Sequence, residues 1–173
     1  MLRRVFLLFA TALVAAPAPA QDAGPPLVER QRIRLNLAGA ETVLDAAKAE
    51  AGALGLKCNI AVVDDGGHLL AFARMDGARP ASASTAMSKA VSAATFRQES
   101  GPLPAGGEPD VLLSLGVENA AGGKITTLRG GVPIVVDGQV IGAVGTGGAT
   151  GEQDALIGKA GVRALLDALE KGR

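Results

Sequence analysis

The chain contains one histidine, His68, placed directly after the turn sequence Asp65-Gly66-Gly67. Because side chains alternate along a strand, His68 is predicted to share a face with Phe72 and Arg74. A neutral imidazole beside apolar side chains can be an axial ligand of haem iron, and a nearby arginine can pair with a haem propionate. Met75 is a softer alternative ligand, although alternation points its side chain to the opposite face. An exposed turn histidine gives the same pattern, and the pattern by itself favours that ordinary interpretation.

A second candidate site consists of two carboxylates and two cations: Asp64, Arg74, Asp76 and Lys89. Clustered carboxylates and a lysine with perturbed pKa values are typical of active sites, so this set predicts an enzyme acting on a small molecule, a lyase or a hydrolase. The glycine-rich segment from Gly145 to Gly151 is expected beside it. For the charged residues Arg74, Asp76, Arg79 and Lys89, the ordinary interpretation is a set of surface ion pairs, which would contribute little to stability.

Residue counts and missing motifs exclude several classes of site. One histidine and one cysteine, Cys58, cannot supply the four ligands of a structural zinc ion. The sequence has no G-x-S-x-G motif to present a serine to His68, so a serine triad is not expected. Cys58 lies in an alternating apolar stretch and is predicted to be a buried small hydrophobic residue.

The glycine-rich segment leads into a helix with a well-marked start. Thr150 and Gln153 have the spacing of a capping box. The segment lacks the Gly-Lys-Ser/Thr ending of a phosphate-binding P-loop. Glu152 and Asp154, in the first helical turn, would repel phosphate. A tight turn followed by a helix cap is therefore favoured over an anion cradle.

The clearest element signal is a β-hairpin that turns at Asp137-Gly138. Two runs rich in β-branched residues flank this pair, and Asp-Gly suits a two-residue turn. This register pairs Ile134 with Ile141 and Val135 with Val140. Both faces of the ribbon are then apolar, so burial on both sides is predicted.

The periodicity of the remaining segments predicts further helices and strands. Helices are predicted over 27–52, 82–98 and 152–169, and strands over 56–64, 68–75, 124–129, 132–136 and 139–144. The predicted buried stripe of the middle helix is Ala83, Met87, Ala90, Val91 and Ala94. The stretch 110–119 fits a short helix or irregular structure. The predicted fold class is α+β: a central antiparallel sheet of about five strands with helices packed on it, in the order helix-strand-strand-helix-strand-strand-strand-helix.

The first twenty residues have the features of a secretory signal peptide. A pair of arginines precedes an apolar run, and Ala18-Pro19-Ala20 is an A-x-A cleavage site. Residues 21–26 are then a short disordered leader, and residues 27–173 a single domain. We expect a periplasmic or secreted protein without a membrane span after cleavage, because the apolar run is too short for one. An uncleaved membrane anchor is the alternative.

Composition and charge bear on the partners of the mature chain. Without the two leader arginines, 15 basic and 17 acidic side chains remain, a formal charge of −2. A nucleic-acid-binding protein needs a basic face and usually stacking aromatic residues. The mature part has only Phe72 and Phe96, so nucleic acid is not an expected partner. Surplus apolar surface on a core of small aliphatic residues predicts a homo-oligomer.

Several stretches of the chain stand out together: VVDDGGHLLAFARMDGA (62–78), SKA (88–90), AATF (93–96), GGVPI (130–134), IGAVG (141–145) and Asp154. In this order, over about residues 30–169, they resemble the GlcG/HbpS family, which also supplies the C-terminal domain of the PduO adenosyltransferases. The resemblance implies an α+β domain with a central antiparallel sheet that assembles into dimers or larger homo-oligomers. It also implies haem binding, and in some members haem degradation or redox sensing outside the cell. The catalytic machinery of PduO belongs to a different domain, so cobalamin adenosylation is not implied.

Residues and resemblance together predict an exported protein that binds haem or another tetrapyrrole and acts in haem sensing, storage or degradation. His68 is the predicted axial ligand, Arg74 or Lys89 the propionate contact, Phe72 the side chain that packs on the macrocycle, and Met75 the softer ligand. Whether the protein is an enzyme stays open, and peroxide-dependent haem degradation is one such activity. The alternatives are the small-molecule enzyme described above and a non-catalytic oligomeric accessory protein.

Overall fold

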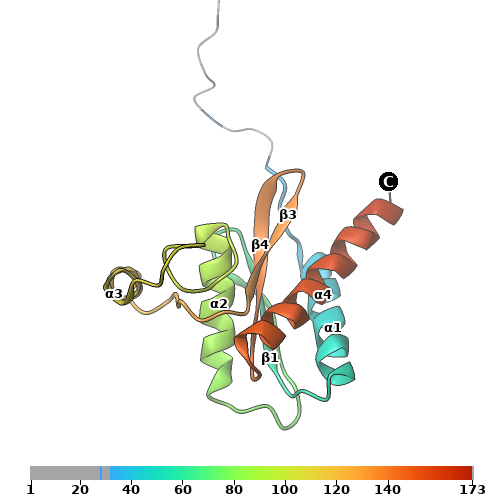
Figure 1. Ribbon diagram of the computed structural model, residues 1–173. Helices are drawn as coiled ribbons and strands as arrows, with labels where there is room; N and C mark the ends of the chain where they lie inside the picture. The colour runs from blue at the N-terminus through green and yellow to red at the C-terminus, as the bar shows by residue number, and fades with distance from the viewer. Residues whose placement is uncertain (1–27, 29–31, 173) are drawn as a thin grey trace, which may run out of the picture. The chain divides into compact units, whose positions relative to one another are not determined.

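The computed structural model describes Val28 and residues 32–172 (Figure 1). The chain divides into two units, Met1–Arg32 and Ile33–Arg173, and the described helices and strands all belong to the second. The predicted signal peptide (1–20), the predicted leader (21–26) and the predicted domain start at residue 27 lie outside the described residues. Within the described residues, every helix is too short or too polar to cross a membrane.

The second unit follows the predicted order of helices and strands except between α2 and β3, where a helix stands in place of the predicted strand. The elements are α1 (Leu37–Ala53), β1 (Asn59–Asp64), β2 (Leu69–Arg74), α2 (Ser82–Phe96), α3 (Val111–Ala120), β3 (Gly131–Val136), β4 (Gln139–Gly147) and α4 (Gly151–Lys171). The strands form one antiparallel sheet in the order β2-β1-β4-β3. The predicted α+β class is confirmed, with four strands instead of about five.

The sheet carries helices on both faces (Figure 1). One face packs against α1 and α4 in the larger core cluster, whose buried members include Val43, Ile60, Val62, Ile134, Val144, Ile157 and Leu165. The other face packs against α2 through small residues: Ala61, Val63, Ala90, Ala93, Ala94 and Ala143. The side chains between sheet and helix are therefore larger under α1 and α4 than under α2, where most of them are alanines.

The segment 124–129, predicted as a fifth strand, is irregular. Its backbone groups are satisfied by side chains instead of by a neighbouring strand. The Ser92 hydroxyl accepts a hydrogen bond from Thr126 N (2.8 Å), and the Ser100 hydroxyl donates to Leu128 O (2.7 Å). Because buried backbone groups need a partner of any kind, these serines make strand pairing unnecessary.

Glycines on the sheet allow α2 to approach it at backbone contact. A Cβ added at Gly145 would lie 2.2 Å from Ala86 O, and one at Gly131 would lie 2.1 Å from Lys89 O. Real Cβ atoms do not come so close, so any larger residue at either position would push α2 away from the sheet. The glycines of β3 and β4 thus set the position of α2 and of the side chains that it carries.

The close approach explains why the buried face of α2 differs from the predicted stripe. Of the five residues predicted, only Ala90 and Ala94 are fully buried. The helix turns small residues and one lysine inward: Ser82, Ala86, Lys89, Ala90, Ser92, Ala93 and Ala94. Larger side chains such as Met87 do not fit between a helix and a sheet whose backbones touch, and they lie at the margin.

A bulge changes the predicted register of the β3–β4 hairpin. Val135 pairs with Val140 as predicted, but the register shifts between Ile134 and Val135, so Ile134 pairs with Gly142 and not with Ile141. The hairpin is buried on both faces as predicted, except for Val135, which is 42% exposed, and for the turn.

Helix boundaries differ from prediction where a polar side chain caps the helix. Helix α1 begins at Leu37, about ten residues later than predicted, because the Asn36 side chain accepts a hydrogen bond from Gly39 N (2.9 Å). The stretch 110–119, which the sequence left open, forms α3, and Asp110 caps it in the same way.

Candidate functional site

His68 lies in the turn between β1 and β2 with its side chain 82% exposed. The Asp64 carboxylate holds this turn together. It accepts hydrogen bonds from Gly66 N (2.9 Å) and His68 N (2.8 Å), and its Oδ1 lies 3.2 Å from His68 Nδ1. Partial burial raises the pKa of Asp64, but the hydrogen bonds from the backbone of His68 and Gly66 and from the imidazole outweigh it, so the pKa lies below its ordinary value. The contact leaves Nε2 as the ring nitrogen without a partner in the described residues.

The strand that follows His68 is an edge strand with a bulge near its start. The register between β1 and β2 shifts between Val62 and Val63, so Leu70 packs with Ala71 in the larger core. The alternation that put His68 on one face with Phe72 and Arg74 is therefore interrupted. Phe72 is 39% exposed and pairs with Ala61, on the side of the sheet covered by α2.

The remaining residues predicted around His68 spread along the hairpin. Arg74 is exposed and pairs with Asn59 at the end of β2 far from the turn. Five residues lie between Arg74 and His68, and six steps along an extended strand span roughly 20 Å. Met75 packs against the larger core on the opposite face from Phe72, as alternation predicts. Asp76 follows Met75 and is exposed.

The proposed enzyme set of Asp64, Arg74, Asp76 and Lys89 is not brought together. Asp64 lies at the turn end of the β1–β2 hairpin, whereas Arg74 lies at its open end. Lys89 lies inside α2 and faces β4 and α4. Among the described residues, no three His, Cys, Asp or Glu side chains are grouped so that they could hold a metal ion.

Lys89 forms a buried ion pair with a residue that the sequence analysis did not assign to it. Its Nζ lies 2.6 Å from Asp154 Oδ2 and donates to Thr146 O (2.9 Å), and the side chains are 6% and 1% exposed. The other carboxylate oxygen of Asp154 accepts from Ala149 N (3.2 Å). Of the two acids expected to repel phosphate, Asp154 is neutralised by Lys89, whereas Glu152 has no cation paired with it in the described residues.

Two neighbours complete the surroundings of this ion pair. The predicted capping box of Thr150 and Gln153 is present at the start of α4 and fixes the first turn, which carries Asp154. Cys58 is fully buried, as predicted. Burial is the main cause that raises the pKa of its thiol, and the Asp154 carboxylate raises it further while Lys89 opposes both.

A cleft of about 380 Å³ opens beside the ion pair, at the N-terminal ends of α2 and α4. Its lining includes Lys89 and Asp154, the arginines Arg79 and Arg129, and Thr85. The sequence analysis named Lys89 as a site residue but missed its position on the buried face of α2, which signals a buried partner. Lys89 follows Ala86 and precedes Ala93 at helical spacing, and a lysine on such an apolar stripe needs a buried acidic partner.

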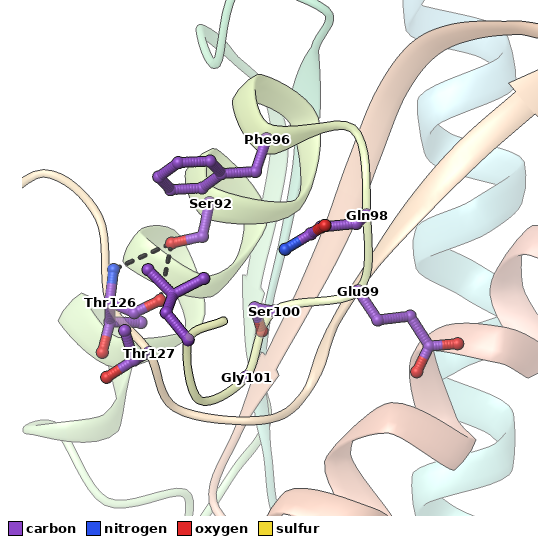
Figure 2. Close-up of a pocket in the computed structure, with 9 residues that line it drawn as sticks. Ser92, Phe96, Gln98, Glu99, Ser100, Gly101, Thr126 and Thr127 are labelled. Atoms are coloured by element: carbon purple, nitrogen blue, oxygen red, sulfur yellow. Dashed lines mark hydrogen bonds between the residues drawn. The ribbon is translucent and has the colours of Figure 1, made fainter. Parts of the chain in front are cut away.

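A smaller pocket lies between α2 and the irregular segment (Figure 2). Ser92 and Thr126 line it with Phe96, Ser100 and Gly101, and the dashed lines mark the hydrogen bonds of the Ser92 hydroxyl to Thr126 N (2.8 Å) and Thr126 O (2.9 Å). Its volume of about 10 Å³ is room for about one water molecule. The hydrogen bonds of Ser92 hold the irregular segment against α2, and the pocket between them is too small for a substrate.

Comparison with known proteins identifies relatives of the whole domain. The model of a family described as "Haem degrading protein HbpS-like" matches residues 35–163. The protein GlcG of Escherichia coli is 39% identical over 116 residues, which cover 67% of this chain and 83% of GlcG.

Solved structures of similar sequence share the fold. The Klebsiella pneumoniae protein ORFY matches with a TM-score of 0.71 at 28% identity, over 82% of this chain and 98% of ORFY. The PduOC:heme complex matches with a TM-score of 0.66 at 26% identity, over 76% of this chain and 95% of PduOC. The resemblance to the GlcG/HbpS family is confirmed, and this chain belongs to the HbpS-like family.

Proposed function

We propose that this protein binds haem and that His68 is the axial ligand of the iron. The observation that carries the proposal is the contact between His68 Nδ1 and Asp64 Oδ1 (3.2 Å) on a side chain that is 82% exposed. A carboxylate at one ring nitrogen orients the imidazole, favours the tautomer with the proton on that nitrogen and makes the other nitrogen a better ligand. Nε2 is then free to reach a haem iron from outside the domain.

The surface beside His68 fits a porphyrin in its chemistry. Leu69 is 52% exposed and Phe72 is 39% exposed on β2, and the register pairs them with Val63 and Ala61, which both face α2. These two side chains give the edge strand an apolar outer surface for the macrocycle. Bound haem would supply an iron centre, and this chain would supply the ligand and the apolar contact.

A propionate contact is the next part of the proposal. The Lys89 ammonium already binds Asp154 and Thr146, which leaves Arg74 as the exposed one of the two predicted cations. Arg74 lies at the far end of β2, so its substitution tests whether the macrocycle extends along the strand. Met75 is packed in the core and serves as the alternative ligand in the same test.

The biological setting is proposed on two further grounds. The features of residues 1–20 support export to the periplasm or beyond the cell. The family description and the haem complex of PduOC support a role in haem storage, sensing or degradation. Self-association is supported by α3, which has no buried residue and exposes Leu112 at 82% and Leu115 at 57%. Because a second copy presents the same apolar helix, a symmetric dimer can cover both.

Haemin titration of the purified protein tests the proposed ligand. The wild type is expected to shift the Soret band with a saturable one-to-one titration, and His68→Ala is expected to weaken binding at least roughly tenfold. Met75→Leu removes the alternative ligand and is expected to bind haemin as the wild type does, because Met75 packs against the core. Absence of a Soret shift with the wild type would contradict haem binding itself. A His68→Ala variant that binds like the wild type would contradict only the role of His68 as the axial ligand.

A further inference from the structure

We propose a second site in this protein, separate from the β1–β2 turn: the cleft beside Lys89 binds a small anionic molecule through a carboxylate or phosphate group. The cleft measures about 380 Å³, within the range of small-molecule sites. It lies where the N-terminal ends of α2 and α4 meet the end of β4. His68 and Phe72 do not line it, so the proposal does not depend on haem binding.

The charges of the cleft favour an anion. Arg79 and Arg129 are exposed on its wall, while Asp154 is compensated by Lys89 at 2.6 Å. The Lys89–Asp154 pair has no net charge, so the two guanidinium groups give the lining of the cleft a net positive charge. Glu152 lines a neighbouring cavity together with Glu99 and Arg129 and does not line this cleft.

The two arginines have donors to spare. In the described part of the chain, the Arg129 side chain makes no hydrogen bond or ion pair, and Arg79 makes one long contact, 3.5 Å from its Nη2 to Gly148 O. A guanidinium group binds a carboxylate or a phosphate through two parallel hydrogen bonds. The arginines thus supply the recognition of the anionic group.

Lys89 forms the buried floor of the cleft, where two protein acceptors hold its ammonium group. Its ammonium group carries three hydrogens, and Asp154 and Thr146 O accept two of them. The lysine is 4% exposed yet lines the cleft, so the remaining donor is held in place for a ligand. Gly130 makes room for this arrangement, because a Cβ there would lie 2.6 Å from Asp154 Cβ and 3.0 Å from Lys89 Nζ.

The geometry assigns complementary parts of a ligand to the cleft. The anionic group pairs with the arginines at the mouth, and a hydroxyl or carbonyl oxygen accepts from Lys89 at the floor. The first turn of α4 begins at Gly151 on the same wall, and the backbone N–H groups of Gly151 and Glu152, which the capping box does not use, add to the attraction for negative charge. The ligand class is a small organic acid or a small phosphorylated compound.

Isothermal titration calorimetry with two probes, malonate and inorganic phosphate, tests the site in a chloride buffer. We expect saturable binding of at least one probe, and the probe that binds tells whether the site prefers carboxylate or phosphate. Arg79→Ala and Arg129→Ala are each expected to weaken that binding at least roughly tenfold, the loss of a charged hydrogen-bond donor pair. Arg163→Ala, an exposed arginine of α4 outside the cleft, is the matched control.

Three results would overturn the assignment. Neither probe binds the wild type, or both arginine variants bind as the wild type does, or Arg163→Ala loses as much affinity as they do. Haemin titration of Arg129→Ala separates this site from the haem site. Unchanged haemin binding supports two sites, and parallel loss of haemin and anion binding would show that the cleft is not a separate site.

Discussion

Lys89 and Asp154 lie 65 residues apart in the chain, yet their side chains form a 2.6 Å ion pair between α2 and the first turn of α4. The pair joins two helices that lie on opposite faces of the sheet, around the end of β4. It therefore fixes the start of α4 relative to α2 and is part of the wall of the cleft.

Removing one partner of this pair is expected to destabilise the fold strongly. Lys89→Met leaves the Asp154 carboxylate buried and uncompensated, which typically costs about 3–5 kcal/mol. Lys159→Met removes an exposed ion pair with Glu99, 51% and 52% exposed, and is expected to cost less than about 1 kcal/mol. Urea unfolding of both variants measures the difference, and a Lys89→Met variant as stable as Lys159→Met would contradict this account of the pair.

A methyl group at Gly145 is expected to push α2 away from the sheet. Its Cβ would lie 2.2 Å from Ala86 O, and this contact is with backbone that no rotamer change can relieve. Gly145→Ala should lower the free energy of unfolding by about 1–3 kcal/mol or more. Gly116→Ala in α3 has no atom within 4 Å and should stabilise slightly, as alanine does in helices. Thermal unfolding that ranks the two variants the other way would contradict the close approach of α2.

Asp64 is expected to make the stability of the protein fall in acid. Burial raises the pKa of Asp64, but stronger hydrogen bonds from the turn bring it below the ordinary 3.8. A carboxyl with a lowered folded pKa stabilises the fold above its ordinary pKa and loses this contribution as the pH falls through the folded value.

Unfolding free energies measured between about pH 7 and about pH 3 check this expectation. Asp64→Asn should be less stable than the wild type at neutral pH, and the gap should narrow in acid. Asp45→Asn, in an exposed pair with Lys48, controls for the loss of one negative charge. A gap for Asp64→Asn that stays constant over this range would contradict the hydrogen-bonded role of the carboxylate.

The Cys58 thiol is expected to be unreactive in the folded protein. It is fully buried, and burial, together with the nearby Asp154 carboxylate, raises its pKa although Lys89 opposes the shift. Because the thiolate is the reactive form, alkylation by iodoacetamide near about pH 8 should be slow in the native state and fast in urea. Fast labelling of the native protein would mean that Cys58 is reached by solvent.

Helix α3 is expected to mediate self-association. Leu112 and Leu115 are exposed there, so Leu112→Lys and Leu115→Lys should lower the oligomeric state in sedimentation velocity experiments. Leu54→Lys, at the end of α1 and 42% exposed, is the control. A wild type that sediments as a monomer would remove the proposed role of α3.

Local signals in the sequence predicted those parts of the fold that depend on neighbouring residues. The turn at Asp137-Gly138 and the capping box of Thr150 and Gln153 are both present, because each needs only a few residues in a row. The predicted start of α1, at residue 27, was wrong because a local signal was overlooked. Apolar periodicity continues upstream of Asn36, but the cap at this residue decides where the helix begins.

Features that depend on distant contacts could not be read from the sequence. Whether 124–129 is a strand depends on Ser92 and Ser100, which satisfy its backbone from another part of the chain. The partner of Lys89 was missed because Asp154 also fits an ordinary helix start, and only the fold brings the two together. Helical spacing alone predicted Ala90 and Ala94 of the buried stripe of α2 but not the rest, since glycines on the facing strands decide which side of the helix fits against the sheet.

The backbone contact between α2 and the glycines of β3 and β4 has a consequence for how this domain tolerates mutation. Contacts between main-chain atoms of α2 and the sheet fix the position of Lys89. A change of side-chain volume elsewhere in the core is therefore expected to leave Lys89 in place. In a random-mutagenesis screen that scores anion binding, damaging substitutions should therefore concentrate at Gly130, Gly131 and Gly145 together with the charged residues, and spare the aliphatic interior under α1.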